Sequence, residues 1–333
     1  MFGTRSALKL RLSFQSVFVL FALLAAPAMN QALGQAYPTK PIRIVSPFAA
    51  GAISDITLRL VGARLGQRLG VQILIENNTG AGGISAARAV IAAAPDGYTL
   101  ALLSNATALS VSLFKNLQFD PVRDFVPVGG ISDFANILAT NGKSSLQSMK
   151  DVIAMARVNP GTLNVGTTII GSSNHLTAAL LKSSTGLDFV IIPYRGPAEL
   201  LLALQRNDVH VIVQSYGALK EAVDKKQIRA LAVTTAKRYP SAPDIPTVQE
   251  AGIRDFEVVS WNGLFAPLKT SQEPVKVLNR ELRVVLTEQD IAARLIDLGV
   301  EPRHSSPEEL GARMRSEITR WARVITDAGI EKQ

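Results

Sequence analysis

Residues 42–69 read IRIVSPFAAGAISDITLRLVGARLGQRL, and this stretch decides the fold. The run from Ile42 to Ser46 is rich in β-branched residues and predicts a strand. Ser54 to Leu69 carries apolar residues at the spacing of one helix face, at Ile56, Leu60, Ala63 and Leu65. A loop of small residues, Pro47 to Asp55, joins the two. The stretch therefore predicts a strand that passes directly into a helix, the repeating unit of parallel α/β sheets.

The same alternation continues along most of the chain. Strand patterns occur at residues 71–76, 99–103, 125–131, 136–139, 163–166, 189–193, 209–214, 230–234 and 258–267. Helical patterns occur at residues 84–94, 148–158, 174–184, 198–205, 218–225, 275–286, 290–298 and 307–328. This order predicts an α/β fold of mostly parallel sheets flanked by helices.

The length of the chain and one break in its rhythm predict two lobes. A length of 333 residues favours two domains at roughly 100 to 200 residues each. The βα rhythm restarts after Asn159-Pro160-Gly161, and the helical tail from Pro274 has no strands of its own. We expect the tail to pack on the first lobe. Lobe 1 is thus predicted to comprise residues 37–138 plus 258–333 and lobe 2 residues 139–257, with two chain crossings at a hinge.

The first 36 residues have the pattern of a secretory signal peptide. Arg5, Lys9 and Arg11 precede an apolar run from Val17 to Ala26, and Gly34-Gln35-Ala36 supplies small residues for cleavage. The run is shorter than the roughly 20 residues that span a bilayer, which argues against a membrane anchor. The sequence predicts export to the periplasm, with Tyr37 as the mature N-terminus.

Composition excludes several classes of function. The chain has no cysteine, which removes disulfides, thiolate nucleophiles and iron-sulfur ligation, and its three histidines are too scattered for a metal site. Residues 76–83 match a dinucleotide-binding loop poorly, because the last small position falls on Ser85. No cofactor or metal is expected. Without the three basic leader residues the net charge of +8 falls to +5, dispersed among acids, so nucleic acid is not an expected partner.

The loop between the first strand and helix is the first candidate for a ligand site. Ligands of open α/β sheets bind where strands end and helices begin, because free N–H groups and the helix dipole favour an anion there. This places Phe48, Ala49, Gly51, Ala52 and Ser54 near a negative group. Asp55 is open to two interpretations, a ligand contact or a plain helix N-cap.

An equivalent loop, Gly166 to His175, opens a helix in the second lobe. Its hydroxyl and backbone N–H groups make a hydrogen-bonding cradle, in which we place Thr167, Gly171 and Ser172. The alternative is an exported hydrolase that uses Ser172 or Ser173 with His175. A G-x-S-x-G nucleophile motif is absent from the sequence, which disfavours that alternative.

Four further residues are predicted to contact the rest of a ligand. Tyr194 and Arg195 follow another second-lobe strand, where a guanidinium can grip a carboxylate through two charge-assisted bonds. An exposed Arg195 paired with Glu199 one turn later is the alternative for that residue. Asn105 and Gln214 complete the set.

Many short segments occur in the order seen in one known family. They are residues 37–43, 47–55, 76–77 with 80–83, 94–100, 171–172 with 175–176, 193–196, 231–234, 243–248 with 250–252, and 261 with 263–267. Over essentially the whole mature chain, the sequence resembles the Bug family, the periplasmic solute-binding receptors of tripartite tricarboxylate transporters. The resemblance implies a two-lobed Venus flytrap of the type II periplasmic class. It also implies a carboxylate held between the loops at 48–54 and 167–173, partly through ordered waters.

The sequence departs from the family pattern in both loops. Ala52 stands where the family usually has glycine, and an alanine at positive φ would cost roughly 1–2 kcal/mol. Ile169 and Ile170 follow Thr168 where the family loop is commonly small and polar, which predicts a tighter or more apolar pocket.

The sequence as a whole predicts a monomeric periplasmic binding protein without catalytic activity. It would capture a small organic anion, either a di- or tricarboxylate, an acidic amino acid or an aromatic acid, and deliver it to a membrane permease or a sensor. Besides the hydrolase, a protein that binds a macromolecule through a basic face remains open, and such binding would collapse with salt.

Overall fold

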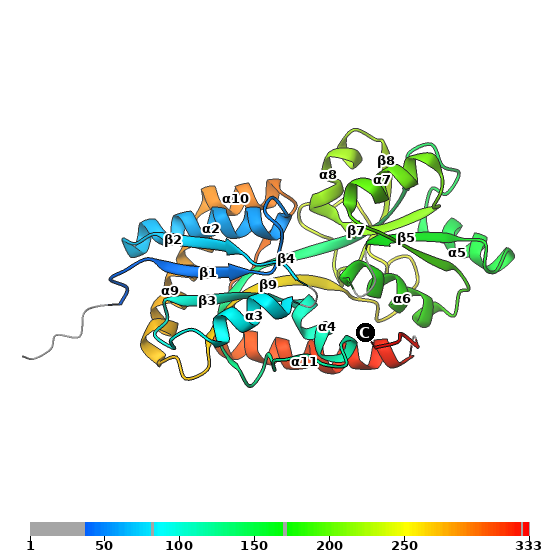
Figure 1. The fold of residues 1–333 in the computed structure, drawn as a ribbon. Helices are drawn as coiled ribbons and strands as arrows, with labels where there is room; N and C mark the ends of the chain where they lie inside the picture. The colour runs from blue at the N-terminus through cyan, green and yellow to red at the C-terminus, as the bar shows by residue number, and fades with distance from the viewer. Residues whose placement is uncertain (1–36, 81–82, 169–171, 328, 333) are drawn as a thin grey trace, which may run out of the picture. The chain divides into compact units, whose positions relative to one another are not determined.

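One long strand, β4 (Phe125–Asn141), pairs with strands of two sheets and connects them (Figure 1). The computed structural model describes residues 37–80, 83–168, 172–327 and 329–332. Within this part of the chain, residues from Tyr37 onward form one compact unit.

The first sheet contains the strand of the opening motif. Its parallel part has the order β2-β1-β3, and β9 then pairs antiparallel with both β3 and β4. The short β10 pairs with β4 at Ser132 and Asp133. The bounds are β1 (Ile42–Ser46), β2 (Ile73–Asn77), β3 (Thr99–Ser104), β9 (Val259–Pro267) and β10 (Glu301–Pro302).

The second sheet repeats the same plan. Its parallel part has the order β7-β5-β6, and β7 and β8 each pair antiparallel with β4. The carboxyl ends of β5, β6 and β7 therefore lie at one edge, where Thr168 and Tyr194 are register partners. The bounds are β5 (Asn164–Thr168), β6 (Val190–Tyr194), β7 (Val211–Ser215) and β8 (Ile228–Val233).

Helices cover both faces of the sheets (Figure 1). Two of them begin with reciprocal capping boxes, Ser104 with Thr107 and Ser148 with Asp151, which satisfy N–H groups that a helix start leaves free. Their bounds are α2 (Ile53–Leu69), α3 (Ile84–Ile91), α4 (Asn105–Leu113), α5 (Met149–Val158), α6 (Ser173–Thr185), α7 (Pro197–Arg206), α8 (Tyr216–Asp224), α9 (Gln272–Thr287), α10 (Gln289–Asp297) and α11 (Pro307–Asp327).

The α/β class expected from the sequence is confirmed, with three differences in the elements. The extended segments expected at 125–131 and 136–139 are one continuous strand, β4. Helix α4 and strand β10 were not expected. The polar pair Ser132-Asp133 breaks the apolar pattern of β4, but Asp133 is held there by Arg313 of α11 at 2.7 Å.

The helical tail packs against more of the molecule than expected. Leu310 and Met314 of α11 join a hydrophobic cluster with β1 and β3 residues. Trp321 and Ile325, farther along α11, join a cluster with Val165, Val211 and other residues of the second sheet. A helix of 21 residues is about 31 Å long, which is enough to reach both sheets. The division into lobes at 138, 139, 257 and 258 stays a prediction.

The predicted signal peptide, residues 1–36, lies outside the described residues. None of the helices in the described ranges combines the length and apolar character that a membrane span requires.

Candidate functional site

A cavity of about 760 Å³ lies where the start of α2 faces α7, α8 and the end of α10. It joins the opening motif of the first sheet to the carboxyl edge of the second. Its lining residues are Gly51, Ala52, Ile53, Ile56, Pro197, Gln214, Ser215, Gly217, Ala218, Lys220, Glu221, Asp224, Lys225, Asp297 and Leu298. Three predicted site residues, Gly51, Ala52 and Gln214, are among them.

The first loop turns at Gly51 rather than at Ala52. Gly51 has φ +80°, in the left-handed region that favours glycine. Ala52 is the N-cap of α2 with φ −64° and ψ 153°, an extended conformation that alanine adopts without strain. The departure from the family pattern at Ala52 therefore carries no conformational cost, and its effect is limited to the added methyl group at the cavity wall.

Asp55 holds this loop in shape. Its side chain is 1% exposed and accepts hydrogen bonds from the Gly51 backbone N–H at 2.9 Å, from Arg59 Nε at 3.0 Å and from Asn77 Nδ2 at 2.7 Å. Asn77 also donates to the Phe48 carbonyl at 2.9 Å. Burial alone would raise the pKa of Asp55, but the hydrogen bonds from Arg59, Asn77 and Gly51 outweigh burial and lower the pKa.

The contacts of Asp55 give it a structural role that neither the ligand-contact interpretation nor the N-cap interpretation describes. It is the third residue of α2 and binds the backbone that precedes the helix, while the N-cap is Ala52. The Gly51 N–H is thus consumed inside the loop. The Ala52 N–H is also used, by the Ala49 carbonyl at 3.1 Å.

Free donors at this corner begin at the next residue, Ile53. The backbone N–H of Ile56 bonds to the Ala52 carbonyl at 2.9 Å, as the first bond of the helix. Among the described residues, the N–H groups of Ile53, Ser54 and Asp55 have no hydrogen-bond partner, as expected for a first helical turn. Ile53 lines the cavity, so the positive end of α2 is directed toward it.

The second sheet contributes a chain of polar side chains at its carboxyl edge. Thr168 Oγ1 donates to Ser172 Oγ at 3.0 Å and accepts from Asn174 Nδ2 at 3.1 Å. Asn174 Nδ2 also donates to Gln214 Oε1 at 2.9 Å, and the Ser215 backbone N–H donates to the same oxygen at 2.7 Å. Both hydrogen bonds are accepted by the side-chain oxygen Oε1 of Gln214, and they fix the direction of its amide nitrogen Nε2.

Two buried amide nitrogens at the predicted site lack partners. Gln214 is 4% exposed and Asn105 3% exposed. Gln214 Nε2 and Asn105 Nδ2 have no hydrogen-bond partner among the described residues. An unpaired buried donor costs about 1–3 kcal/mol, so such groups call for a ligand or an ordered water. Gln214 lines the cavity, whereas Asn105, the first residue of α4, does not.

Several predicted residues do not line the cavity. Phe48 is half-buried against the first core, and Ser54 is buried in α2. Thr167 is fully buried, and its Oγ1 donates to the Thr168 carbonyl at 3.0 Å. The side chain of Thr168 points to the other face of β5, as alternation along a strand requires. Ala49, Ser172, Tyr194 and Arg195 are also absent from the lining. Gly171, Ile169 and Ile170 lie outside the described residues.

Arg195 and Glu199 interact through the backbone. The Arg195 N–H donates to Glu199 Oε2 at 3.0 Å, and Glu199 is the third residue of α7. This repeats the contact between Gly51 and Asp55 at the opposite corner. Both strand-to-helix corners thus use an acid in the first helical turn to tie down the preceding loop. The guanidinium of Arg195 is exposed, and its predicted grip on a carboxylate stays a prediction.

The arrangement of Ser172 and His175 is that of a helix cap. Ser172 Oγ accepts the backbone N–H of His175 at 3.2 Å, and Ser172 is the N-cap of α6. The His175 side chain lines a different cavity, of about 630 Å³, between α6 and β6. Burial lowers the pKa of His175, which favours its neutral form. Across the described ranges, no group of three His, Cys, Asp or Glu side chains is placed to hold a metal ion.

The sequence did not indicate most residues of the cavity wall. Gly217, Ala218 and Lys220 follow within six residues of Gln214, and the rule that ligands bind beyond strand ends could have found them. Asn174 is equally close to a predicted loop. Asp297 and Leu298 come from the end of α10, and no local pattern marks that helix end as part of a site.

Two sheets joined by β4, with a cavity that a helix N-terminus from one and a strand edge from the other both line, define a solute-binding protein of the periplasmic type. Residues 57–330 match the family described as "Tripartite tricarboxylate transporter family receptor". The chain belongs to this family, whose members are periplasmic receptors and not enzymes.

Individual relatives agree with this assignment. Protein BugT of Bordetella pertussis is 30% identical over 315 residues, which cover 94% of this chain and 95% of BugT. The structure of R. palustris Rpa4515 with adipate has a TM-score of 0.80 and 34% identity, and the match covers 89% of this chain and 100% of that one. The periplasmic binding protein BugD has a TM-score of 0.77 and 30% identity, with coverage of 89% and 100%. The resemblance to the Bug family is confirmed, and a hydrolase finds no support.

Gly51→Ala is expected to destabilise the receptor, because alanine at φ +80° costs roughly 1–2 kcal/mol. Ala52→Gly is the matched control at the adjacent position, where φ is −64°. We expect thermal unfolding to show a lower Tm for Gly51→Ala than for Ala52→Gly. Equal melting temperatures for the two variants would show that the turn does not require glycine at residue 51.

Gly217→Ala is expected to force α8 away from the turn after α10. A methyl group on Gly217 would lie 2.4 Å from the Leu298 carbonyl oxygen and 3.6 Å from Ile53 Cγ1, so backbone must move. We expect a loss of about 1–3 kcal/mol in unfolding free energy, measured by denaturant titration. Gly196→Ala is the control, since nothing lies within 4 Å of its added methyl group. The close contact is not a constraint if both variants unfold alike.

Proposed function

We propose that this receptor captures a small organic carboxylate in the 760 Å³ cavity. It would do so in the periplasm, after cleavage of residues 1–36, and as a monomer. The loaded receptor would then deliver the acid to a membrane permease of the tripartite type or report it to a sensor.

The observation that supports a carboxylate is the unpartnered amide nitrogen of Gln214 at the cavity wall. It lies opposite the first turn of α2, where the Ile53 N–H has no partner among the described residues. Both groups are hydrogen-bond donors, and a deprotonated carboxylate is a pure acceptor with two oxygens. Ordered waters can bridge any donor that the acid does not reach, at little cost in binding free energy.

We propose a class of organic acids as ligands rather than a single compound. The structurally similar Rpa4515 is described with adipate, which supports a carboxylate ligand here. Dicarboxylates, tricarboxylates, acidic amino acids and aromatic acids all fit the requirement for one acid group at the α2 N-terminus. The two predicted lobes would close on the acid by bending at β4, the strand that both sheets share.

A thermal-shift screen of organic acids tests this function. The protein, purified from the periplasm after expression of the full chain, is heated with each acid and with the neutral diamide of the same skeleton, such as adipate beside adipamide. An acid at 100 times its Kd adds about 2.7 kcal/mol, which raises the Tm by a few degrees. The diamide is expected to have no effect. Equal shifts from acid and diamide, or no shift from any acid, would remove the proposal.

The hydrolase alternative is tested with the same preparation. Esters of the best acid are incubated with the wild-type protein and with His175→Ala. We expect no turnover from either protein and the same acid affinity in both. Ester hydrolysis that disappears in His175→Ala would instead support an enzyme.

A further inference from the structure

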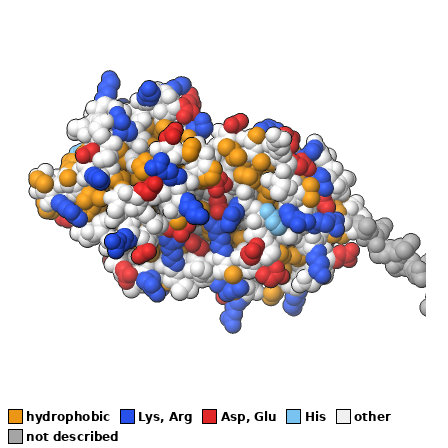
Figure 2. Space-filling model, turned by 180° about the vertical axis from the view of Figure 1, so that it is seen from behind, with side chains coloured by type: hydrophobic (Ala, Val, Ile, Leu, Met, Phe, Trp, Pro, Cys, Tyr) orange, Lys and Arg blue, Asp and Glu red, His pale blue; other side chains and the backbone are white. Residues whose placement is uncertain are grey.

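A second concave surface, separate from the cavity at α2, lies between α9 and the loop that precedes α11. Its volume is about 390 Å³, and it shares no lining residue with the larger cavity. We call it the α9 basic pocket and define it by Lys276, Arg280, Arg283, His304 and the adjacent Arg303. Figure 2 shows Lys and Arg side chains gathered on one face of the molecule, with Asp and Glu side chains among them.

The helix presents the three α9 cations on one face. Lys276, Arg280 and Arg283 are spaced at i, i+4 and i+7, which places them along about 10 Å of one helix side. The opposite wall is fixed to the helix by Asn279, whose Nδ2 donates to the Ser305 carbonyl at 2.9 Å and to the Val128 carbonyl at 2.8 Å. The pocket is therefore a built feature rather than a row of unconstrained surface side chains.

Two of the four Lys and Arg side chains here, Lys276 and Arg283, have no ion-pair partner among the described residues. Arg303 Nε reaches only Asp133 at 4.0 Å. Arg280 uses its Nε for Glu281 at 2.9 Å, which leaves its two terminal nitrogens available. Glu308 is the one acid in the lining, and the nearby Glu309 accepts the Ser306 N–H at 2.8 Å. His304 adds a polar side chain to the wall of the pocket. Burial lowers its pKa, which favours the neutral form of the imidazole.

We propose that the α9 basic pocket is a docking site for an acidic segment of a partner protein. The segment would carry at least two carboxylates about 10 Å apart, to match the length of the cationic face. A lipid surface fits less well, because none of the exposed large apolar side chains of the described residues lines the pocket as a membrane anchor would. The docking role rests on the proposed function, because a receptor that delivers its ligand to a membrane complex needs a docking surface outside the ligand cavity.

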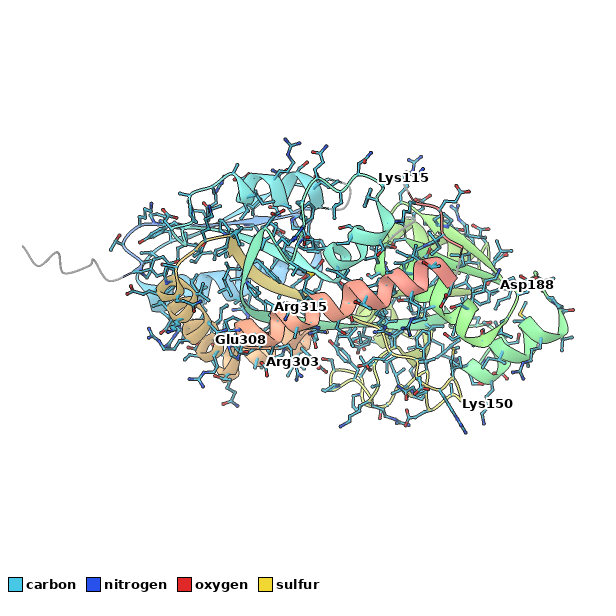
Figure 3. All side chains as sticks on the ribbon, turned by 90° about the horizontal axis from the view of Figure 1, so that it is seen from below. Lys115, Lys150, Asp188, Arg303, Glu308 and Arg315 are labelled. Carbon is cyan, nitrogen blue, oxygen red and sulfur yellow. The ribbon has the colours of Figure 1, made fainter. Side chains whose placement is uncertain are left out.

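The pocket is tested with a fluorescein-labelled deca-glutamate peptide, whose binding to the exported, purified protein is followed by fluorescence anisotropy at low salt. The test variant is Lys276→Glu with Arg283→Glu. The matched control is Lys115→Glu with Lys150→Glu, which makes the same change in net charge. Arg303 and Glu308 lie close together at the start of α11, whereas Lys115 and Lys150 project from other parts of the surface (Figure 3).

The α9 variant is expected to lose at least tenfold in peptide affinity, whereas the peptide affinity of the control variant should change by less than about threefold. Both variants should keep the thermal shift with the best organic acid, and that acid should not compete with the peptide. These readouts separate failure of docking from failure of ligand binding. Equal loss in both variants, no peptide binding at low salt, or tighter binding to vesicles of anionic lipid than to the peptide would each overturn the proposal.

Discussion

Asp55→Asn lowers the melting temperature and weakens acid binding at the same time. In the wild type, the Asp55 carboxylate accepts hydrogen bonds from the Gly51 N–H at 2.9 Å and from Arg59 Nε at 3.0 Å. The amide of the variant keeps an oxygen that can accept from Asn77, but its NH2 group faces these two donors. Two partly buried donors then face a third. We expect a loss of about 2 kcal/mol in unfolding free energy, or roughly 4–8 °C in Tm, with part of the Arg59 contribution screened by solvent.

The effect on binding follows from the loop that Asp55 organises. Without the carboxylate, the Phe48 to Ala52 backbone is free to leave the geometry that sets the start of α2 against the cavity. We expect at least a tenfold loss in acid affinity by isothermal titration calorimetry. Asp188→Asn is the control, since that carboxylate is exposed and pairs with Lys182 at 3.2 Å on the surface. If Asp55→Asn behaves like Asp188→Asn, the loop does not depend on Asp55.

The same contribution has a predictable dependence on pH. The pKa of Asp55 is lower in the folded protein than its usual value of about 4. Its stabilisation is therefore fully present above that usual value and is lost as pH falls through the folded pKa. The difference in stability between the wild type and Asp55→Asn should be constant from pH 5 to 7 and shrink in acid. A difference that grows below pH 4 would contradict the assignment.

Gln214→Glu is expected to abolish acid binding while keeping the hydrogen bonds that residue 214 accepts at the strand edge. A carboxylate at residue 214 still accepts the Asn174 and Ser215 hydrogens at 2.9 and 2.7 Å, so the polar network survives. What changes is the second terminal atom, from an unpartnered donor to a negatively charged acceptor. Two like charges about 4 Å apart at an effective dielectric of 20 repel by about 4 kcal/mol, close to a thousandfold in affinity.

Two controls isolate the role of the Gln214 amide. Gln205→Glu makes the same chemical change on an exposed position of α7 and should leave binding unchanged. Gln214→Met removes the donor without adding charge, but it also removes the oxygen that accepts from Asn174 and Ser215 and should therefore lower stability as well. It should cost about 1–3 kcal/mol of binding, less than the glutamate. Calorimetry in which Gln214→Glu binds the acid as tightly as wild type would place the acid away from this residue.

Local sequence patterns predicted those parts of the fold that local interactions determine. The transition from β1 to α2 follows from β-branched residues, a glycine turn and a helical apolar face in immediate succession. Helix α4, NATALSVSL, was missed because its Ser, Thr, Asn and Val residues favour helix weakly. It is stabilised instead by the capping box at Ser104 and by burial of Leu109 and Leu113.

The same limit applies to the site. Gly51, Ala52 and Gln214 were predicted because each adjoins the end of a strand. Asp297 and Leu298 reach the cavity because the end of α10 packs against α8. They lie more than 200 residues away from Ile53 in the sequence. The choice between Gly51 and Ala52 as the turn residue also required backbone angles, since either order of a small residue and a glycine permits a turn. The roles of Asn105, Tyr194 and Arg195 stay predictions.

A crystal structure of the receptor with the tightest-binding acid from the screen is the most direct measurement of how the cavity works. One carboxylate should lie within hydrogen-bond distance, directly or through one water, of the Ile53 N–H and of Gln214 Nε2. An acid bound with its carboxylate elsewhere, and with Gln214 Nε2 still unpartnered, would contradict the account.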